Sequence, residues 1–298
     1  DVAASSFGAE PIGIWPTSRT EALRRLDHFI DNALPLFGPH EDAMMSTNWH
    51  LAHSMLSPAL NIGLLHPREI CDRVEQAYRA GRIPIQSAEG FIRQIIGWRE
   101  FVWNLYWAQP PEYADMNSLD ATRPLPPAFT NAAATQMNCV SSIVQDIHDR
   151  GWVHHIPRLM VLGNLALIAG INPQEFTQWM WDSFVDAAEW VMVPNVIGMS
   201  LYADGGILAT KPYAAGGAYI DRMSDYCKTC IYDRKKRVGD DACPFTTLYW
   251  DFLLRHADRF AKNPRIVTQV RAAQKLKDTE EVRARSREVL LALDAGQI

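Results

Sequence analysis

This chain has few cysteines, no large excess of positive or negative charge and no long apolar run, and each of these absences argues against a class of protein. Five cysteines among 298 residues are too few for a secreted disulfide scaffold. Lys and Arg total 29 against 34 Asp and Glu, and the net charge of −5 argues against a wholly electrostatic nucleic-acid binder but not against a local basic patch. The longest apolar runs, such as residues 161–171, contain Gly and Asn and are too short to span a membrane. No signal-peptide pattern is present, so we expect a cytoplasmic protein without a membrane partner.

Strand signals are weak, whereas helix signals recur. There is no run of alternating Val, Ile and Thr bounded by hairpin turns. Ser18 and Glu21 have the spacing of a capping box, and Asn172 before Pro173 is typical of a second helix start. Apolar residues follow both starts at helical spacing. The pattern predicts an all-α protein with one compact domain and a small cysteine-bearing subdomain near the C-terminus.

Four longer segments complete this prediction. Residues 153–169 are expected to form a buried helix, and residues 263–293 a charged helical region. Pro and Gly cluster in residues 110–127 and 203–217, which predicts two long loops. Loops of that length in a compact domain are usually functional.

The cysteine spacing is the sharpest local signal. Cys227 and Cys230 are separated by two residues, which turns the chain so that both thiolates reach one metal centre, and Cys243 follows after twelve intervening residues. Cys139 and Cys71 are the candidates for a fourth ligand, but Cys71 lies in a helical apolar stripe that is typical of a core thiol. The spacing leaves two interpretations open, a tetrahedral zinc site and a 4Fe-4S cluster.

Four residue sets, taken together, resemble the iron–sulfur bacterial cryptochromes and photolyases, a family that includes bacterial (6-4) photolyases. The sets are Cys139 with the three later cysteines, residues 53–63 (HSMLSPALNIG), residues 97–101 (GWREF), and residues 154–158 (HHIPR) followed by 184–186 (FVD). The likeness runs from about Trp15 to about Arg265. It implies a photolyase-type helical domain with two cofactors, FAD and a 4Fe-4S cluster held by Cys139, Cys227, Cys230 and Cys243.

The resemblance also implies a domain organisation. Residues 17–298 are expected to form the FAD-binding catalytic domain, in which an iron–sulfur segment at about 220–298 is closed by Cys139. Residues 1–16 look like the end of an interdomain linker, because nothing in the chain resembles the family's N-terminal antenna-binding domain. A lumazine-type antenna pigment is therefore expected as a partner only where that domain is present.

The family's flavin-phosphate segment corresponds here to His53, Ser54, Leu56 and Ser57, with Asn61 reaching the ribose or adenine. A helix start rich in Ser offers hydroxyl and backbone N–H groups to a pyrophosphate. Judged alone, the same segment is equally well explained as an ordinary helix start.

A second group of residues is expected around the flavin ring. Arg99 is expected to donate to the flavin or its phosphates, and Arg158 to stabilise negative charge on the ring. Asp186, held by Arg158, is expected to accept from the flavin N3–H, with Glu189 assisting. Met192 falls near the position where many photolyases face the flavin with an amide or an acid. Structural ion pairs and core packing are the alternative interpretations.

The resemblance also assigns catalytic residues. His155 is expected to exchange a proton with the substrate and His154 to be its partner in a mid-helix pair, since imidazole titrates near neutral pH. Tyr213 and Tyr219 are expected to line the pocket of a flipped-out dinucleotide. Trp179 resembles the family's main electron-relay residue, while the family's second relay tryptophan is missing upstream of the first cysteine. Interior packing is the alternative for each aromatic residue.

The function implied is light-driven repair of a pyrimidine (6-4) photoproduct by electron transfer from reduced FAD, with ultraviolet-damaged DNA as partner and the protein as a monomer. A cryptochrome-type blue-light photoreceptor that uses the same FAD without repair is the alternative. A non-flavin iron–sulfur nucleic-acid protein is a third possibility, against which the flavin-phosphate segment and Arg99 argue.

Overall fold

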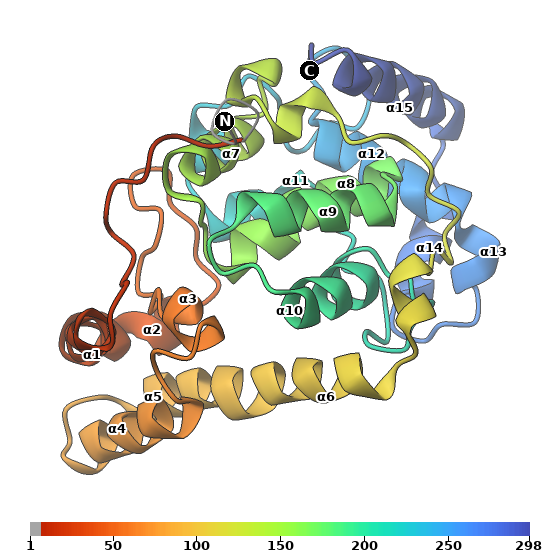
Figure 1. Cartoon of the computed structure of the whole chain (residues 1–298). Helices are drawn as coiled ribbons and strands as arrows, with labels where there is room; N and C mark the ends of the chain where they lie inside the picture. The colour runs from red at the N-terminus through yellow and green to blue at the C-terminus, as the bar shows by residue number, and fades with distance from the viewer. Residues whose placement is uncertain (1–6) are drawn as a thin grey trace.

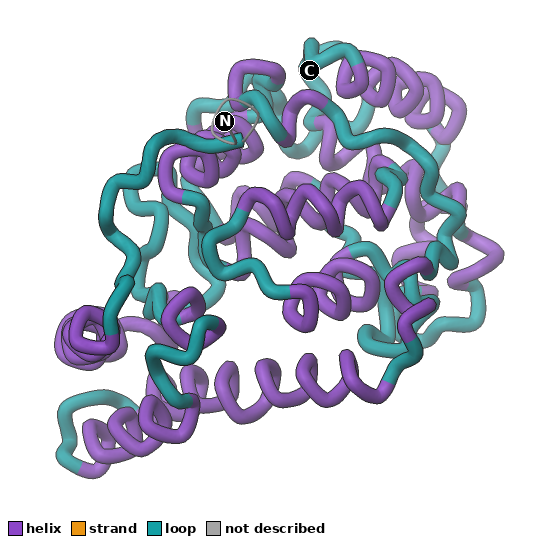
Figure 2. Tube along the Cα trace, in the orientation of Figure 1, coloured by secondary structure: helices purple, strands orange, loops and turns teal. Residues whose placement is uncertain are grey.

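The computed structural model describes residues 7–298, and all of its regular elements are helices (Figures 1 and 2). The α-helices are α1 Arg19–His28, α2 Leu34–His40, α3 Ser57–Asn61, α4 Pro67–Arg79, α5 Ile85–Ile92, α6 Glu100–Ala108, α7 Asn138–Arg150, α8 Asn164–Ala169, α9 Pro173–Ser183, α10 Glu189–Val193, α11 Gly217–Met223, α12 Pro244–Arg255, α13 Ala257–Phe260, α14 Val267–Gln274 and α15 Thr279–Asp294. The prediction of an all-α fold is confirmed. None of the described helices is long and apolar enough to cross a membrane.

Four π-helical segments continue these helices. Phe29–Ala33 joins α1 to α2, Arg93–Arg99 joins α5 to α6, Pro157–Gly163 leads into α8, and Pro194–Ser200 extends α10. A π-helical turn widens the backbone spiral and is found most often at functional sites. Three of these segments return below as walls of a cavity.

Both predicted helix starts are present. The Ser18 hydroxyl accepts from the Glu21 amide, and the Glu21 carboxylate accepts from the Ser18 amide, so the capping box is complete. The Asn172 side chain accepts from the amides of the second and third residues of α9. Gly170 ends α8 with a φ of 76°, a left-handed conformation that favours glycine.

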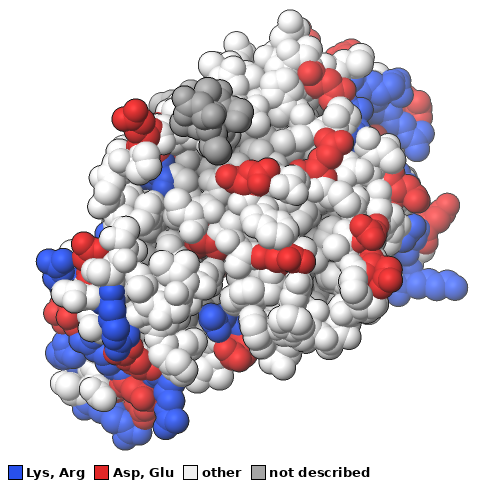
Figure 3. Space-filling view, viewed as in Figure 1, with Lys and Arg blue, Asp and Glu red and all other residues white. Residues whose placement is uncertain are grey.

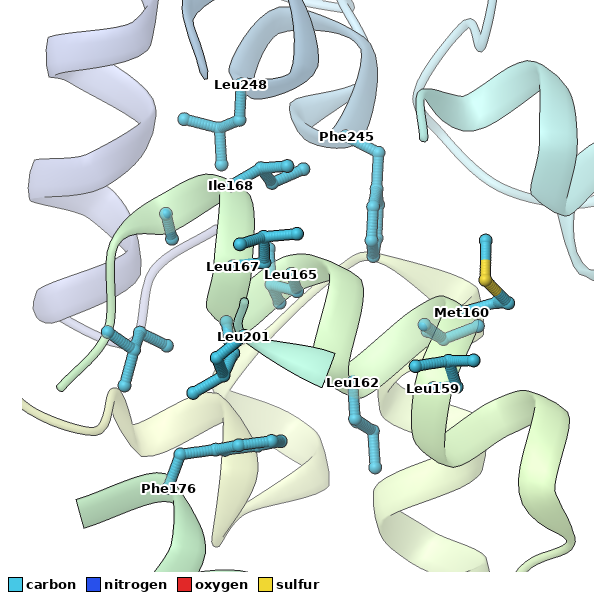
Figure 4. Packing of buried hydrophobic residues seen from close by; sticks show 14 of the residues in the cluster. Leu159, Met160, Leu162, Leu165, Leu167, Ile168, Phe176, Leu201, Phe245 and Leu248 are labelled. Atoms are coloured by element: carbon cyan, nitrogen blue, oxygen red, sulfur yellow. The ribbon is translucent and has the colours of Figure 1, made fainter. Parts of the chain in front are cut away.

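The buried side chains form two separate hydrophobic clusters. The smaller one is built by α1 to α5 with the segments that join and follow them, and we call this part, residues 15–99, the N-terminal bundle. The larger one is built mainly by the remaining helices, α6 to α15, and we call residues 100–298 the C-terminal bundle. At its centre the helix formed by residues 157–169 packs between α9, which contributes Phe176, and α12, which contributes Phe245 and Leu248 (Figure 4).

Two of the predicted segments differ in detail. The predicted helix 153–169 begins only at His155, so His154 and His155 lie at a helix start and not in mid-helix. The charged region 263–293 divides into α14 and α15, whereas residues 203–217 form the expected loop before α11.

The predicted linker remnant lies partly outside the described residues, which exclude residues 1–6. The rest of it is irregular and runs from beside α7 to α1 (Figure 1). The Ala9 amide donates to the His148 carbonyl and the Trp15 indole donates to the Arg150 carbonyl, so this segment is bound to the end of α7.

Candidate functional site

A cavity of about 600 Å³ lies at the seam between the two bundles. Phe37, Leu60 and Phe91 line it from the N-terminal bundle, and Leu159 and Met160 from the C-terminal bundle. Most of the predicted flavin and substrate residues line it as well: His53, Ser54, Ser57, Asn61, Arg99, His154, His155, Arg158, Asp186, Tyr213 and Tyr219. Residues that are far apart in sequence are therefore brought together at one place.

The π-helical segments supply much of the wall. Arg99 belongs to the π-helical segment between α5 and α6, and Arg158 to the one before α8. Asn195 and Met199 belong to the segment that follows α10. Since π-helical turns occur frequently at functional sites, their position supports this cavity as the functional site.

Asp186 is the centre of the polar wall and ties the two bundles together. Its Oδ2 accepts from Ser57 Oγ at 2.5 Å, Trp152 Nε1 at 3.0 Å and one Arg158 nitrogen at 3.0 Å. Its Oδ1 accepts from the other Arg158 nitrogen at 2.9 Å, and its backbone carbonyl accepts from Asn61 Nδ2 at 2.6 Å. A carboxylate has about four acceptor positions, so Oδ1 retains one for an N–H donor in the cavity.

Arg158 is fixed in the same network. Besides its bidentate pair with Asp186, its Nε donates to the Val153 carbonyl at 2.7 Å, and its guanidinium lies over the Phe184 ring at 4.1 Å. The side chains of Arg158 and Asp186 are 14% and 6% exposed, so the ion pair is largely shielded from water. A buried bidentate pair of this kind holds its geometry, which suits a group that must orient a ligand.

Three histidines surround the deeper part of the cavity. The rings of His53 and His154 stack at 3.9 Å between centroids, and His155 follows directly. Burial, with a smaller effect of His155, lowers the pKa of His53 to about 3, and burial lowers that of His154 well below its usual value. His155 lines the cavity, and desolvation by the surrounding protein, with a smaller effect of Arg158, lowers its pKa to about 4. All three imidazoles are therefore neutral at pH 7, whereas we had expected His154 and His155 to titrate near neutrality.

Several polar atoms of the wall are buried without a partner. His53 Nε2, His154 Nδ1, Arg99 Nε and Glu41 Oε2 make no hydrogen bond to the described residues. An unpaired buried polar atom costs about 1–3 kcal/mol, so several of them in one wall indicate that a polar ligand completes the site. A dinucleotide with a heteroaromatic ring has the donors, acceptors and size for such a cavity.

Four predicted residues lie outside the cavity wall. Leu56 is buried in the core of the N-terminal bundle, and Trp179 in that of the C-terminal bundle. Glu189 is exposed at the start of α10 and is close to the Tyr106 hydroxyl. Met192 is 2% exposed and packs in the larger core, because helical spacing turns Val191 and Asn195 toward the cavity instead. The amide of Asn195 thus lies in the wall to which we assigned Met192.

Two further wall residues escaped the sequence reading. Trp152 donates to Asp186 and Ser57, and its only sequence signal was its place two residues before the histidine pair. Trp98 is 40% exposed and lies in the wall within the GWREF motif. A tryptophan that stays partly exposed within a motif is a better candidate for ligand contact than for packing.

The predicted relay residue Trp179 and a series of three contacting tryptophans lie in different surroundings. Trp179 contacts Phe129, Phe176 and Phe184 in the core, and its indole N–H has no acceptor among the described residues. Trp190, in the cavity wall beneath Arg99, contacts Trp103, which contacts Trp107, a residue that is 66% exposed. The electron-relay role of Trp179 stays a prediction.

The four predicted ligand cysteines line a second, much smaller pocket. Cys139 lies at the start of α7, Cys227 and Cys230 in the loop after α11, and Cys243 at the start of α12. All four are free thiols, and burial raises the pKa of Cys139 and Cys243. Gly217 is so close that a Cβ there would lie 2.8 Å from Cys243 Sγ. Within residues 7–298 no group of three or more Cys, His, Asp or Glu is arranged to hold a single metal ion.

The chain is homologous to a (6-4) photolyase of Agrobacterium fabrum, with 49% identity over 249 residues that cover 84% of this chain and 49% of the relative. The chain thus spans about half the length of that protein. It shares its fold with a bacterial class III photolyase from Agrobacterium tumefaciens, at a TM-score of 0.55 and 21% identity over 95% of this chain and 57% of the other. A cryptochrome from Synechocystis gives a TM-score of 0.55 at 17% identity over 73% and 47%. No protein-family model matches the chain.

Proposed function

We propose, because the chain is homologous to a bacterial (6-4) photolyase, that it binds FAD in the cavity between its bundles and performs the catalytic part of light-driven repair of (6-4) photoproducts in DNA. The observation that carries the proposal is the Asp186 network, which joins both bundles around a cavity whose wall holds unpaired polar atoms. FAD, when bound, supplies the absorption of light and the electron.

The chain's own residues fit the binding of FAD. Ser54 lies in the cavity wall just before α3, where its hydroxyl and the amides at the helix start suit a pyrophosphate. The Ser57 hydroxyl donates to Asp186 and so positions that carboxylate. The free acceptor position of Asp186 Oδ1 suits an N–H of the flavin ring, and the fixed Arg158 guanidinium beside it stabilises negative charge there. The unpaired Nε of Arg99 gives one further donor.

The substrate side is formed by His155, Tyr213 and Tyr219, with Trp98 as a stacking surface. A neutral imidazole carries one N–H donor and one acceptor, so His155 can hold a proton at one nitrogen and deliver it to an oxygen of the lesion. His154 stacks on His53 behind it and fixes the start of this helix. Aromatic faces at the rim suit a base that has left the stack of a duplex.

An absorption spectrum of the purified protein and a repair assay test this function. We expect flavin bands in the blue, and light-dependent restoration of the bases in a duplex that carries one (6-4) photoproduct, followed by chromatography. The same reaction kept in the dark, and a duplex with a cyclobutane dimer, are the controls. If the protein contains flavin but restores no (6-4) lesion in light, the repair function is wrong and the photoreceptor function is the remaining one.

We also propose that Cys139, Cys227, Cys230 and Cys243 hold a 4Fe-4S cluster that closes the C-terminal subdomain. The support is that three separate segments direct cysteines into one pocket. A cubane spreads its ligands over four irons, whereas zinc gathers them around one ion, so the metal content of the purified protein separates the two. Iron analysis of Cys227→Ser against Cys71→Ser tests this: we expect iron to be lost only from the former.

The photoreceptor alternative rested on Met192 and on the missing second relay tryptophan. Met192 lies in the core while Asn195 lines the cavity, whereas the absence of a tryptophan at residues 129–131 still favours the alternative. A requirement for the lumazine-type antenna pigment, the monomeric state and the cytoplasmic location stay predictions.

A further inference from the structure

One segment of this acidic chain carries positive charge without any compensation. Residues 259–277, which include α13 in part, α14 and the turn between them, contain no Asp or Glu. They contain six cationic residues, all exposed: Arg259, Lys262, Arg265, Arg271, Lys275 and Lys277. None of the six forms an ion pair within the described part of the chain. We call this segment the basic segment.

The cations of α4 and of the turn after it are neutralised locally. On α4 and the turn after it, Arg68 pairs with Asp72, Arg79 with Glu75, and Arg82 with Asp31. Figure 3 accordingly shows blue and red atoms intermixed over α1, α4 and α5.

The run of six cations near the cysteines, residues 222–237, is half neutralised. Arg234 pairs with Asp221, Lys236 with Asp241, and Arg237 with Asp278. Arg222, Lys228 and Lys235 form no ion pair among the described residues, but acids and paired cations lie between them along the chain. In the basic segment, by contrast, all six cations are unpaired and no acid lies between them.

The basic segment is connected to the rim of the cavity. Asn263 Nδ2 donates to the Thr210 carbonyl at 2.9 Å, and the Arg265 amide donates back to Asn263 Oδ1 at 3.0 Å. Lys211, exposed and without an ion pair among the described residues, follows Thr210 directly, and Tyr213 of the cavity wall lies two residues further. Unpaired cations thus extend from the cavity rim onto α13 and α14, which lie at the right edge of the molecule in Figures 1 and 3.

We propose that the basic segment, with Lys211, is the surface that binds the phosphate backbone of the duplex on one side of the lesion. The proposal rests on the proposed function, since it assigns the DNA contacts of that same site. Surface cations that already pair with carboxylates gain little from a phosphate, whereas unpaired cations release the condensed counterions of DNA when they bind. The exposed side of α14, with Thr268, Gln269 and Gln274 beside its cations, offers further donors to phosphate oxygens.

The test is the salt dependence of binding of the flavin-loaded protein to a duplex that carries a (6-4) photoproduct. The variant Lys262→Gln/Arg265→Gln/Arg271→Gln is compared with Arg68→Gln/Arg79→Gln/Arg82→Gln, which changes the net charge equally but removes paired cations. We expect the slope of log K against log salt to fall by about 2–3 in the first variant, and affinity to fall roughly eightfold per lost contact at 0.1 M salt. The control is expected to keep the wild-type slope. Thermal unfolding and flavin content verify that both variants are folded.

Two results overturn the inference in different ways. If the wild type binds and repairs the lesion duplex but the first variant has an unchanged slope, or both variants change it equally, the basic segment is not the phosphate surface and the proposed function stands. If the flavin-loaded wild type binds no duplex at low salt, the proposed function and this inference both fail.

Discussion

The N-terminal and C-terminal bundles use similar residues in different ways. In the N-terminal bundle the arginines of α1, of α4 and of the first turn after α5 are mostly paired with acids, and the core is small. The C-terminal bundle has the larger core and the histidine pair, and it also carries the unpaired basic segment. The cavity lies between them, and neither bundle holds the site alone. The comparison teaches that exposed paired charges are already satisfied and contribute little to stability, whereas unpaired charge and unpaired polar atoms mark the places where a ligand or partner completes the protein.

The largest effect is expected where the two bundles meet, at Asp186. Asp186→Asn leaves Arg158 buried beside a neutral group, and breaking a buried pair costs about 3–5 kcal/mol. Urea unfolding and bound-flavin absorbance are the measurements, and both are expected to fall. Glu69→Gln, which breaks the exposed pair with Arg19, is the control and is expected to cost less than about 1 kcal/mol. Equal losses in the two variants would show that breaking the buried ion pair between the bundles costs no more than breaking an exposed ion pair.

The next largest effect is expected at His155 of the C-terminal bundle, where the loss of catalysis can be distinguished from a loss of packing. His155→Gln keeps a hydrogen-bonding side chain in the cavity but removes a group that transfers protons, so we expect repair per absorbed photon to fall about a hundredfold while flavin content is retained. The exposed His40→Gln is the matched control and should repair like the wild type. Full repair by His155→Gln would remove His155 from the proton-transfer step.

The loss of folding stability at acid pH depends on buried histidines of both bundles. The folded pKa of His53, about 3, lies below the unfolded value of about 6.5, so its contribution to stability is complete above pH 6.5 and is lost as the pH falls toward 3. His154 and His155 act in the same direction. Asp146, whose pKa burial raises to about 6, opposes them below that pH but is a single group.

Urea midpoints at pH 7.0, 6.0 and 5.0, without bound flavin, measure this effect. Between pH 6.5 and 5 we expect His53→Gln to lose about 2 kcal/mol less stability than the wild type, since one pKa unit corresponds to about 1.4 kcal/mol. The same pH dependence in both proteins would mean that water reaches the His53 ring.

The smallest effect is expected at the paired surface of the N-terminal bundle. Arg79→Gln removes an exposed ion pair with Glu75 one helical turn away, and such pairs contribute about 0.3–0.5 kcal/mol. Thermal unfolding at low and high salt checks this, because screening should remove the difference. A loss above about 1 kcal/mol would contradict the view that these pairs contribute little to stability.

Much of the site was predictable because each part of it is a short motif with its own local chemistry. The GWREF and HHIPR motifs, the serines before α3 and the cysteine spacing each point to residues that line the two pockets. The prediction for Met192 failed because it depended on the direction of a single side chain. Met192 and Asn195 are one helical turn apart, and the sequence does not tell which of them the packing of α10 turns toward the cavity.

The sequence by itself determined the helical class, the helix starts and the residue types of the site, because capping, helical periodicity and motif spacing act over a few neighbouring residues. The tertiary structure alone decided that Ser57, Asn61, Arg158 and Asp186 meet across a seam, that three histidines lose their usual pKa, and that one group of cations is unpaired. These properties depend on burial and on distances between residues far apart in the chain, and the free energy of packing two bundles fixes both.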